Sequence, residues 1–283
     1  MKYGEGYEKK LDFEIKEITT EQAYQLIYYN HYSKVLPKLT KCILGGFIDG
    51  ELKATMTLGW GTRPVHTIKA IFPSLDSKDY YEIGKMCLTE DLKKNAESQF
   101  LSRCIKWVKE FRPEIKIIYT WADGMLGKPG YVYQSANFLY GGFITTDTYL
   151  TENGEKVHPR TSQKIDRENN RDTHSVGARP TKEFLVEHNW SHWKGRQFRY
   201  LVFTCDKRTK RDLLKESPFR WNTDYPKGKD LTWTEKNLST GKWEERTSIP
   251  YDKDVCEFNT SVEKAFNKYI NVPAFQDVEE LFE

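Results

Sequence analysis

The order of strand and helix signals over residues 12–157 is the feature that most restricts how this chain can fold. Residues 12–18 (DFEIKEI) alternate like a strand, and Thr19 with Gln22 forms a capping box that opens a helix toward Asn30. Two apolar runs then flank Asp49-Gly50, a dipeptide that readily adopts positive φ and therefore predicts a β-hairpin. The chain thus begins with a strand, a helix and a hairpin.

Strand and helix signals keep alternating after this hairpin. Residues 80–90 (YYEIGKMCLTE) predict a strand, and Asn95 is placed to cap a helix that ends at Arg112-Pro113. That helix carries one apolar stripe, predicted to be buried: Phe100, Leu101, Cys104, Trp107, Val108 and Phe111.

Residues 115–123 (IKIIYTWAD) predict a fully buried strand, because their apolar run does not alternate. Residues 130–143 predict a short helix stopped by Gly141-Gly142, and Asn153-Gly154 predicts a second hairpin. The whole order predicts an α/β (α+β) fold with one mixed, mostly antiparallel sheet and helices on its faces.

The second half of the chain has weaker periodicity. Residues 160–194 are polar and charged, residues 198–205 (FRYLVFTC) predict one more strand, and the composition changes after Asp206. We expect a catalytic domain over residues 1–205, with a basic insertion or arm at about 160–195. Residues 206–283 form a C-terminal extension whose role the sequence does not indicate.

Positive charge is concentrated in one region. The net charge is +3, yet residues 156–211 hold fourteen Lys or Arg against six Asp or Glu. Such a region suits DNA or RNA, since releasing condensed counterions favours binding, although a merely solvated face has the same composition. No apolar stretch long enough to cross a bilayer and no signal peptide is expected, which favours a cytoplasmic protein.

The cysteines do not indicate a disulfide framework or a zinc site. They are odd in number, far apart and without CxxC spacing, so we expect free and mostly buried thiols: Cys42, Cys87, Cys104, Cys205 and Cys256. His188 and His192 have the spacing of one helix face but no obvious third ligand, so a metal is not expected.

Seven short segments resemble, in the same order, those of the phage Mom family, and the order of elements is that of the N-acetyltransferase (GNAT) fold. They span about residues 28–204: Asn30-His31-Tyr32-Ser33 with Pro37, GGFIDGEL, YYEIGKMCL, TWADG, GYVYQSANFLYGG, NGEKVHPRT and GRQFRYLVF. The resemblance implies a phage enzyme that converts adenine in DNA to a carbamoylmethyl derivative on its 6-amino group, protecting the DNA from restriction nucleases. By matching motif it implies functional roles for His31, Tyr32, Lys85, Ser98, Asp123 and Tyr133, where Lys85 replaces an Arg usual in relatives.

Two departures bear on the donor of the transferred group. An ordinary GNAT protein binds the coenzyme A pyrophosphate with a glycine-rich loop before its main helix, and here that stretch reads LKKNAESQF, without glycine. The amides near Ser98, with Lys93 and Lys94, are still candidates for binding phosphate. Simple acetyl transfer does not give the alkyl link of the family's product, so we hypothesise an activated glycine donor such as glycyl-tRNA, with acetyl coenzyme A as the alternative.

The residues themselves suggest the chemistry. Asp123 follows a buried strand, at the end where such sheets open into a crevice, and is placed to accept the proton of the weakly nucleophilic amino group. His31 is a candidate proton relay or hydrogen-bonding group, and Tyr133 a candidate acid. Each has a purely structural alternative: Asp123 as a turn residue, His31 as a helix cap and Tyr133 as a core residue.

Adenine in a duplex must be flipped out or met in a melted strand, so stacking and phosphate contacts are needed. Gln134 and Asn137 are candidates for pairing with the base edge. The predicted basic arm and the strand after it mix rings with cations, and the candidates for DNA contact there are Arg160, Trp193, Arg196 and Arg199. The rival functions are a conventional N-acetyltransferase acting on a protein or small amine and a non-catalytic nucleic-acid-binding protein.

Overall fold

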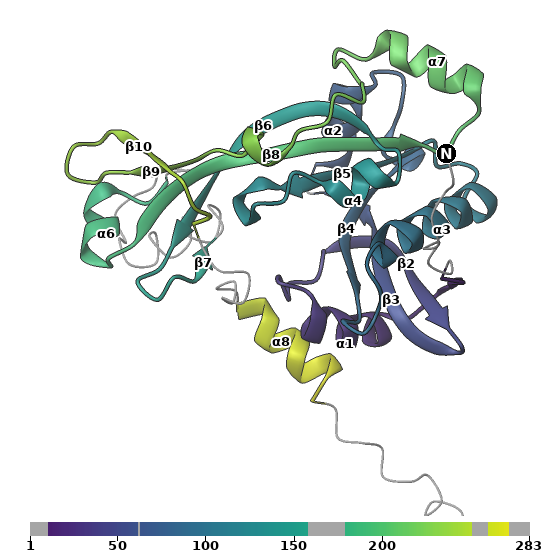
Figure 1. Ribbon diagram of the computed structural model, residues 1–283, viewed down its shortest axis with the longest axis horizontal. Helices are drawn as coiled ribbons and strands as arrows, with labels where there is room; N and C mark the ends of the chain where they lie inside the picture. The colour runs from purple at the N-terminus through teal and green to yellow at the C-terminus, as the bar shows by residue number, and fades with distance from the viewer. Residues whose placement is uncertain (1–10, 62, 158–178, 251–259, 272–283) are drawn as a thin grey trace, which may run out of the picture.

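The computed structural model describes residues 11–61, 63–157, 179–250 and 260–271. Within them one sheet runs in the order β1-β2-β3-β4-β5-β8-β6-β7, with β9 paired to β8 and β10 to β9 (Figure 1). Every pairing is antiparallel except that of β4 with β5. The predicted mixed, mostly antiparallel sheet is therefore confirmed.

The first strands and helices follow the predicted order closely. They are β1 (Glu14–Glu17), α1 (Thr20–Asn30), β2 (Leu39–Ile48), β3 (Glu51–Trp60), α2 (Pro64–Ile71), β4 (Tyr80–Leu88), α3 (Ala96–Phe111), β5 (Ile117–Asp123) and α4 (Tyr131–Ser135). The remaining elements are β6 (Leu139–Leu150), β7 (Lys156–Val157), α6 (Lys182–Glu187), β8 (Ser191–Phe203), α7 (Lys207–Glu216), β9 (Trp233–Lys236), β10 (Trp243–Arg246) and α8 (Thr260–Tyr269).

Local signals explain the elements that were predicted correctly. Thr19 accepts a hydrogen bond from the Gln22 amide, and the Gln22 side chain accepts one from the Thr19 amide, so the capping box is confirmed. Asp49 and Gly50 have φ of 51° and 84°, as a tight two-residue hairpin requires. Gly154 also has positive φ and closes the second hairpin, between β6 and β7.

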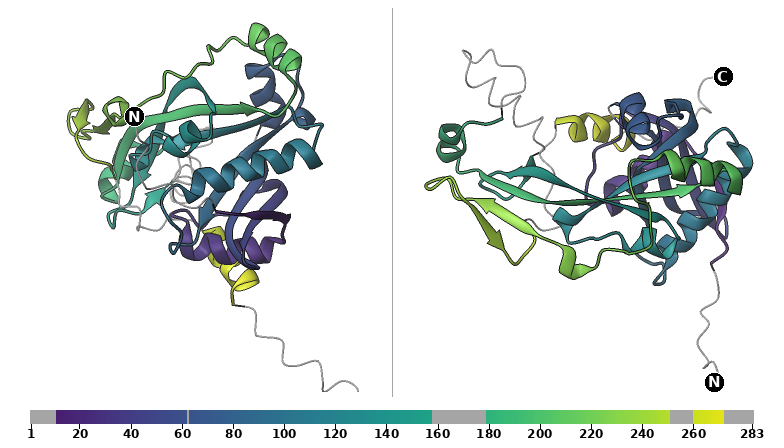
Figure 2. Two further views of the ribbon diagram at one scale, coloured as in Figure 1. Left: turned by 45° about the vertical axis from the view of Figure 1, so that its right-hand side comes forward. Right: turned by 90° about the horizontal axis from the view of Figure 1, so that it is seen from above.

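Helices cover both faces of the sheet (Figure 2). On one face, Phe100, Leu101 and Cys104 of α3 pack into the largest apolar cluster together with side chains of β2 to β5. On the other face, α2 packs over β5 and α7 beside it, while α1 packs over Ile43 and Cys87 and also contacts α8. The predicted stripe on α3 is confirmed for Phe100, Leu101, Cys104 and Val108, while Trp107 is partly buried and Phe111 is 51% exposed.

Four local features differ from the prediction. The glycine pair Gly141-Gly142 does not stop a helix but lies inside β6, where the pairing with β8 shifts register between Tyr140 and Phe143. β8 starts at Ser191, within the stretch predicted as a basic arm, because this stretch pairs with β6 on one side and with β9 on the other. The loop predicted before β4 contains α2. Asn95 does precede α3, but its side chain accepts no hydrogen bond from the helix.

The long strands β6 and β8 extend beyond the body of the sheet into an arm that also carries β9, β10 and α6 (Figure 1). Cys42, Cys87 and Cys104 are buried free thiols and Cys205 is half-buried, while Cys256 lies outside the described residues. Among the described helices, none is both long and apolar enough to cross a membrane.

Candidate active site

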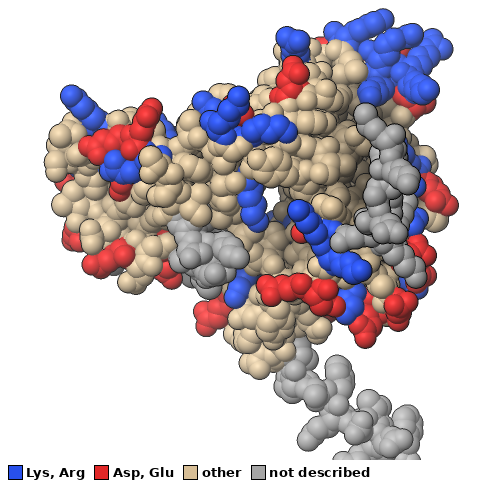
Figure 3. All heavy atoms as spheres, viewed as in Figure 1, with Lys and Arg blue, Asp and Glu red and all other residues tan. Residues whose placement is uncertain are grey.

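The separation of β4 from β5 creates the main cavity. The two parallel strands pair only through Tyr80–Glu82 and Ile117–Tyr119, and then they diverge. A register shift between β3 and β4 lies at this point, opposite Gly84. The resulting cavity of about 890 Å³ is lined by both strands, by residues 28–34 after and within α1, and by the starts of α3 and α4. Figure 3 shows a hollow in the middle of the molecule, with Lys and Arg side chains beside it.

His31 ends α1 and lines this cavity. His31 Nδ1 lies 2.9 Å from both the amide nitrogen and the carbonyl oxygen of Ser33, so this nitrogen contacts Ser33 in either tautomer of the ring. Burial, together with the neighbouring Lys85 ammonium, lowers the pKa of His31 to about 3. The imidazole is therefore neutral at physiological pH, and its role as a proton relay or as a hydrogen-bonding group stays a prediction.

Tyr32 lies stacked on His31, with ring centroids 4.3 Å apart. The ammonium groups of Lys85 and Lys128 lie 5.8 and 5.4 Å from the centre of its ring. Lys85 also donates to Ser33 Oγ at 2.7 Å, so one lysine ties the end of α1 to β4. This part of the cavity is cationic and aromatic, a combination that suits an anionic or π-rich ligand.

Asp123 is the last residue of β5, and its side chain is 15% exposed. One carboxylate oxygen accepts from the Met125 amide at 3.0 Å, and the other accepts from Lys156 Nζ at 3.2 Å. Asp123 therefore holds a turn, as the structural alternative stated, and also lines the cavity as the catalytic prediction requires. The pairing with Lys156 was not foreseen, because 33 residues separate the two in sequence.

Tyr133 lies on α4 and lines the same cavity. Thr120 Oγ1 donates to its phenolic oxygen at 3.4 Å, and its ring packs near Phe138 and Tyr200. Burial raises the pKa of Tyr133 above its usual value. The hydroxyl thus stays protonated and is available as a hydrogen-bond donor.

The start of α3 opens into the same cavity through Ala96 and Glu97, with Lys93 beside them. Because Asn95 leaves the first amides of the helix uncapped by its side chain, this end offers N–H donors and the positive end of the helix dipole. Ser98 donates its hydroxyl back to the Asn95 carbonyl, and Lys94 is exposed outside the cavity lining. Of the four predicted cofactor residues, Lys85 and Lys93 line the cavity.

The residues predicted to read the base edge lie outside this cavity. Gln134 Nε2 donates to the carbonyls of Pro129 and Pro226 and to the Tyr200 hydroxyl, and its Oε1 accepts from Lys227. Its amide is thus engaged on both sides within the protein. Asn137 is exposed and has φ of 61°, which suits the turn between α4 and β6.

The residues predicted for DNA contact are dispersed. Arg196 and Arg199 lie on opposite faces of β8: Arg196 donates to the Asp230 carbonyl, and Arg199 donates to that of Gly141. Trp193 is 9% exposed and packs with Met125 and Leu126, the cluster against which Tyr32 rests. Trp193 therefore supports the cavity rather than an external arm, while Arg160 lies outside the described residues.

Glu82 is a carboxylate that the sequence reasoning missed. It lines a smaller cavity of about 240 Å³, which adjoins the main one at Gly84. Burial raises its pKa to about 7, against a hydrogen bond from the Gly61 amide that lowers it. No sequence signal marks Glu82, because its burial depends on how β3 and the chain before β2 close over β4. In the described part of the chain, no three His, Cys, Asp or Glu side chains gather to hold a metal.

Known proteins are similar to this chain in sequence or in structure. The methylcarbamoylase mom of Escherichia phage Mu is 28% identical over 214 residues, which cover 76% of this chain and 86% of that protein. Among solved structures, the ribosomal-protein-S18-alanine N-acetyltransferase of Escherichia coli aligns with a TM-score of 0.39 at 9% identity, over 69% of this chain and 96% of that one. An acetyltransferase of Bacillus subtilis in complex with CoA gives 0.36 at 14% identity, over 68% and 99%.

The family comparison covers more of the chain than the short segments did. The model of the Mom protein family matches residues 12–227, which include β1 at one end and the chain beyond α7 at the other. This match spans most of the described sheet and the whole lining of the main cavity. The chain therefore belongs to the Mom protein family.

Proposed function

We propose that this protein is a DNA-modifying transferase that adds a carbamoylmethyl group to the 6-amino group of adenine, in the cavity between β4 and β5. The proposal rests on membership of the Mom family, on the phage relative named a methylcarbamoylase, and above all on one observation. Four of the residues expected to carry the chemistry line a single cavity: His31, Tyr32, Asp123 and Tyr133. In a phage-infected host, the modification would protect the DNA in the cytoplasm from restriction nucleases.

The cavity suits a flipped base. Its volume of about 890 Å³ lies within the range of roughly 300–1,000 Å³ that is typical of ligand sites. The Tyr32 ring supplies a stacking surface, and Lys85 and Lys128 beside it supply positive charge for the nearby phosphates. These contacts offset the few kcal/mol that it costs to unstack one base from a duplex.

Asp123 is the proposed general base. The lone pair of the adenine 6-amino nitrogen is delocalised into the ring, so removing a proton as the new bond forms lowers the barrier. The contacts with Met125 and Lys156 fix the orientation of the carboxylate, and each oxygen keeps a further lone pair for substrate. The neutral His31 and the protonated Tyr133 act as hydrogen-bonding groups that orient base and donor.

The donor in this proposal is an activated glycine, such as glycyl-tRNA. Attack of the 6-amino nitrogen on the glycyl carbonyl forms an amide and expels the carrier. The free amine of that glycyl group then attacks ring carbon 6 and expels the amide nitrogen, which yields carbamoylmethyladenine with the same atoms. The amides at the start of α3 and Lys93 are placed to bind a phosphate of the carrier.

The test is to express the protein with a plasmid, digest the plasmid to nucleosides and measure their masses. We expect a deoxyadenosine heavier by one C2H3NO unit. Asp123→Asn should lower its yield by at least about 100-fold, the lower end of a general base's contribution. Asp212→Asn, an exposed carboxylate on α7, is the matched control and should not change the yield.

Other results of these experiments would point to the rival functions. Acetyl coenzyme A turnover without DNA would indicate a conventional N-acetyltransferase. Unmodified nucleosides, with DNA binding that Asp123→Asn leaves intact, would indicate a binding protein. Labelling cells with nitrogen-15 glycine tests the donor separately, because the rearrangement places the glycine nitrogen between the ring and the methylene carbon. A modified base without label would exclude glycine while leaving the modification itself in place.

A further inference from the structure

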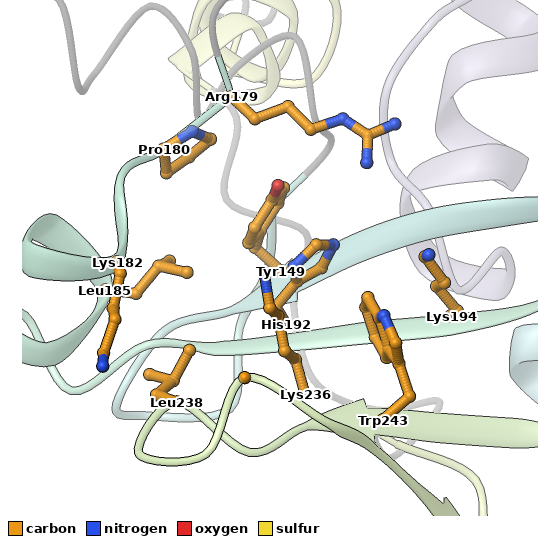
Figure 4. Close-up of a pocket in the computed structure, with 11 residues that line it drawn as sticks. Tyr149, Arg179, Pro180, Lys182, Leu185, His192, Lys194, Lys236, Leu238 and Trp243 are labelled. Atoms are coloured by element: carbon orange, nitrogen blue, oxygen red, sulfur yellow. The ribbon is translucent and has the colours of Figure 1, made fainter.

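A second cavity lies in the arm, away from the proposed active site. Its volume is about 300 Å³, and it is enclosed by β6, β8, α6, the β9–β10 hairpin and the segment before α6 (Figure 4). Four cationic side chains surround it: Arg179, Lys182, Lys194 and Lys236. They come from three separate segments of the chain, since Arg179 and Lys182 are close in sequence, and the fold brings these segments together.

The positive charge of this cavity is only partly neutralised. Asp147, which is 13% exposed, pairs with Arg179 at 2.6 Å and with His192 at 3.1 Å. Among the described residues, no carboxylate lies within salt-bridge distance of the Lys182, Lys194 or Lys236 ammonium. Burial lowers the pKa of His192, so the ring is neutral and adds no charge of its own. The described side chains therefore leave a net excess of about three positive charges.

Stacked and edge-on rings line one side of the cavity and position Lys194. Lys194 Nζ lies 4.0 Å from the centre of the Trp243 ring, and Trp243 meets the edge of His192 at 4.9 Å. His192 in turn stacks on Tyr149 with ring centroids 4.4 Å apart. In Figure 4, Lys194 lies beside the Trp243 ring, while the Lys182 side chain lies at the opposite side of the view, apart from these rings. Lys194 and Arg179 are thus held by contacts within the protein, through Trp243 and Asp147, while Lys182 lies exposed at the edge of the cavity.

One strand links this cavity to the active site. Successive side chains of β8 point to opposite faces, so Lys194 faces the second cavity while Trp193 faces the other way. Trp193 packs in the cluster that supports Tyr32. A ligand in the second cavity therefore lies across a single strand from a wall of the active site.

We propose that this second cavity binds backbone phosphates of the substrate DNA strand at nucleotides next to the target adenine. This proposal rests on the proposed function. The cations and the small volume suit a phosphodiester group, whose recognition is independent of base sequence. Arg196 and Arg199 do not line this cavity and each donates to a protein carbonyl, so the proposal assigns the phosphate contact to the four cations that do line it. The contact anchors the strand while one base is extruded.

The test is the salt dependence of DNA binding, measured by fluorescence anisotropy with a labelled oligonucleotide. Each lost phosphate contact lowers the slope of log K against log salt by about 0.7–0.9. We expect the double variant Lys194→Gln/Lys236→Gln to lose about 1.5 in slope. The exposed Lys182→Gln on α6 should lose about one contact and does not touch the packing around Trp243. Thermal melting checks that both variants are folded.

Lys207→Gln/Lys215→Gln on α7 is the matched control, because this exposed helix carries the basic patch at the top right of Figure 3. It should leave the slope unchanged. Full slopes in the pocket variants, or a loss confined to the α7 variant, would overturn the proposal. Pocket variants that bind transfer RNA more weakly but bind the DNA oligonucleotide as the wild type does would also overturn it. DNA binding is measured without catalysis, so the two proposals can fail separately. Modified DNA together with unaltered slopes in the pocket variants would refute this phosphate site but not the proposed function. Lowered slopes together with unmodified DNA would refute the proposed function but not this site.

Discussion

The neutral state of His31 leads to a quantitative prediction about acid stability. The pKa of His31 is about 3 in the folded protein against 6.5 for an unperturbed imidazole. The unfolded chain therefore takes up a proton at a pH where the folded site does not. Each pH unit below 6.5 then costs about 1.4 kcal/mol of stability until the folded pKa is reached. Between about pH 7.5 and pH 4.5 this amounts to about 2.5 kcal/mol.

The perturbation is His31→Asn, whose side-chain oxygen retains an acceptor for the Ser33 amide but does not titrate. The assay is urea denaturation at both pH values, with the free energy of unfolding extrapolated to water. We expect the wild-type protein to lose about 2.5 kcal/mol more than the variant on acidification. Other titrating groups, His192 included, are present in both proteins and cancel in this comparison.

His66→Asn, on the exposed side of α2, controls for the loss of an imidazole elsewhere in the chain. Its effect on the pH dependence of stability is compared with that of His31→Asn. Equal losses on acidification in the wild type and in His31→Asn would refute the reasoning. They would mean that His31 ionises freely in the folded protein, and that the contacts with Ser33 and Lys85 do not describe its surroundings.

Two further predictions concern residues whose roles the sequence left open or concealed. Because the folded pKa of Glu82 is raised to about 7 from 4.5, its burial costs stability as pH rises between those values. The free energy of unfolding of Glu82→Gln should therefore rise by about 3 kcal/mol relative to that of the wild type between pH 4.5 and 7.5. Urea denaturation that gives the two proteins the same change in unfolding free energy over this range would contradict the prediction. Gln134→Leu should lower the unfolding free energy by about 2 kcal/mol, since it removes partners from three acceptors and Lys227. Its DNA affinity, measured by anisotropy, should stay unchanged, and a specific loss of adenine recognition in a stable protein would restore the base-reading role.

The sequence predicts best where the cause is local. Thr19 with Gln22, and Asp49 with Gly50, satisfy or bend the backbone within a few residues, so their structure follows from their chemistry. The end of β5 at Asp123 was likewise found from the buried run before it. The resemblance to the Mom family added His31 and Tyr32, whose spacing alone suggested no more than a helix end.

The rest depends on contacts between distant segments. Residues Ser191–Gly195 read as a basic arm, because their burial arises only when β6 and β9 lie on either side of them. Arg196 and Arg199 were predicted to contact DNA, and the sequence does not indicate that each donates a hydrogen bond to a carbonyl of a distant segment, at Asp230 and Gly141. The charged cavity in the arm likewise joins residues 179–194 with residues 236–243.

The most direct test of the account is to locate an adenine on the protein. A DNA strand with a single 8-azidoadenine would be bound, photolysed and digested, and the cross-linked peptides identified by mass spectrometry. The account predicts labels on the walls of the main cavity, in residues 28–34 and 120–133, and a label that unmodified competitor DNA removes. Labels confined to α7 or to the arm, with none in the cavity between β4 and β5, would contradict it.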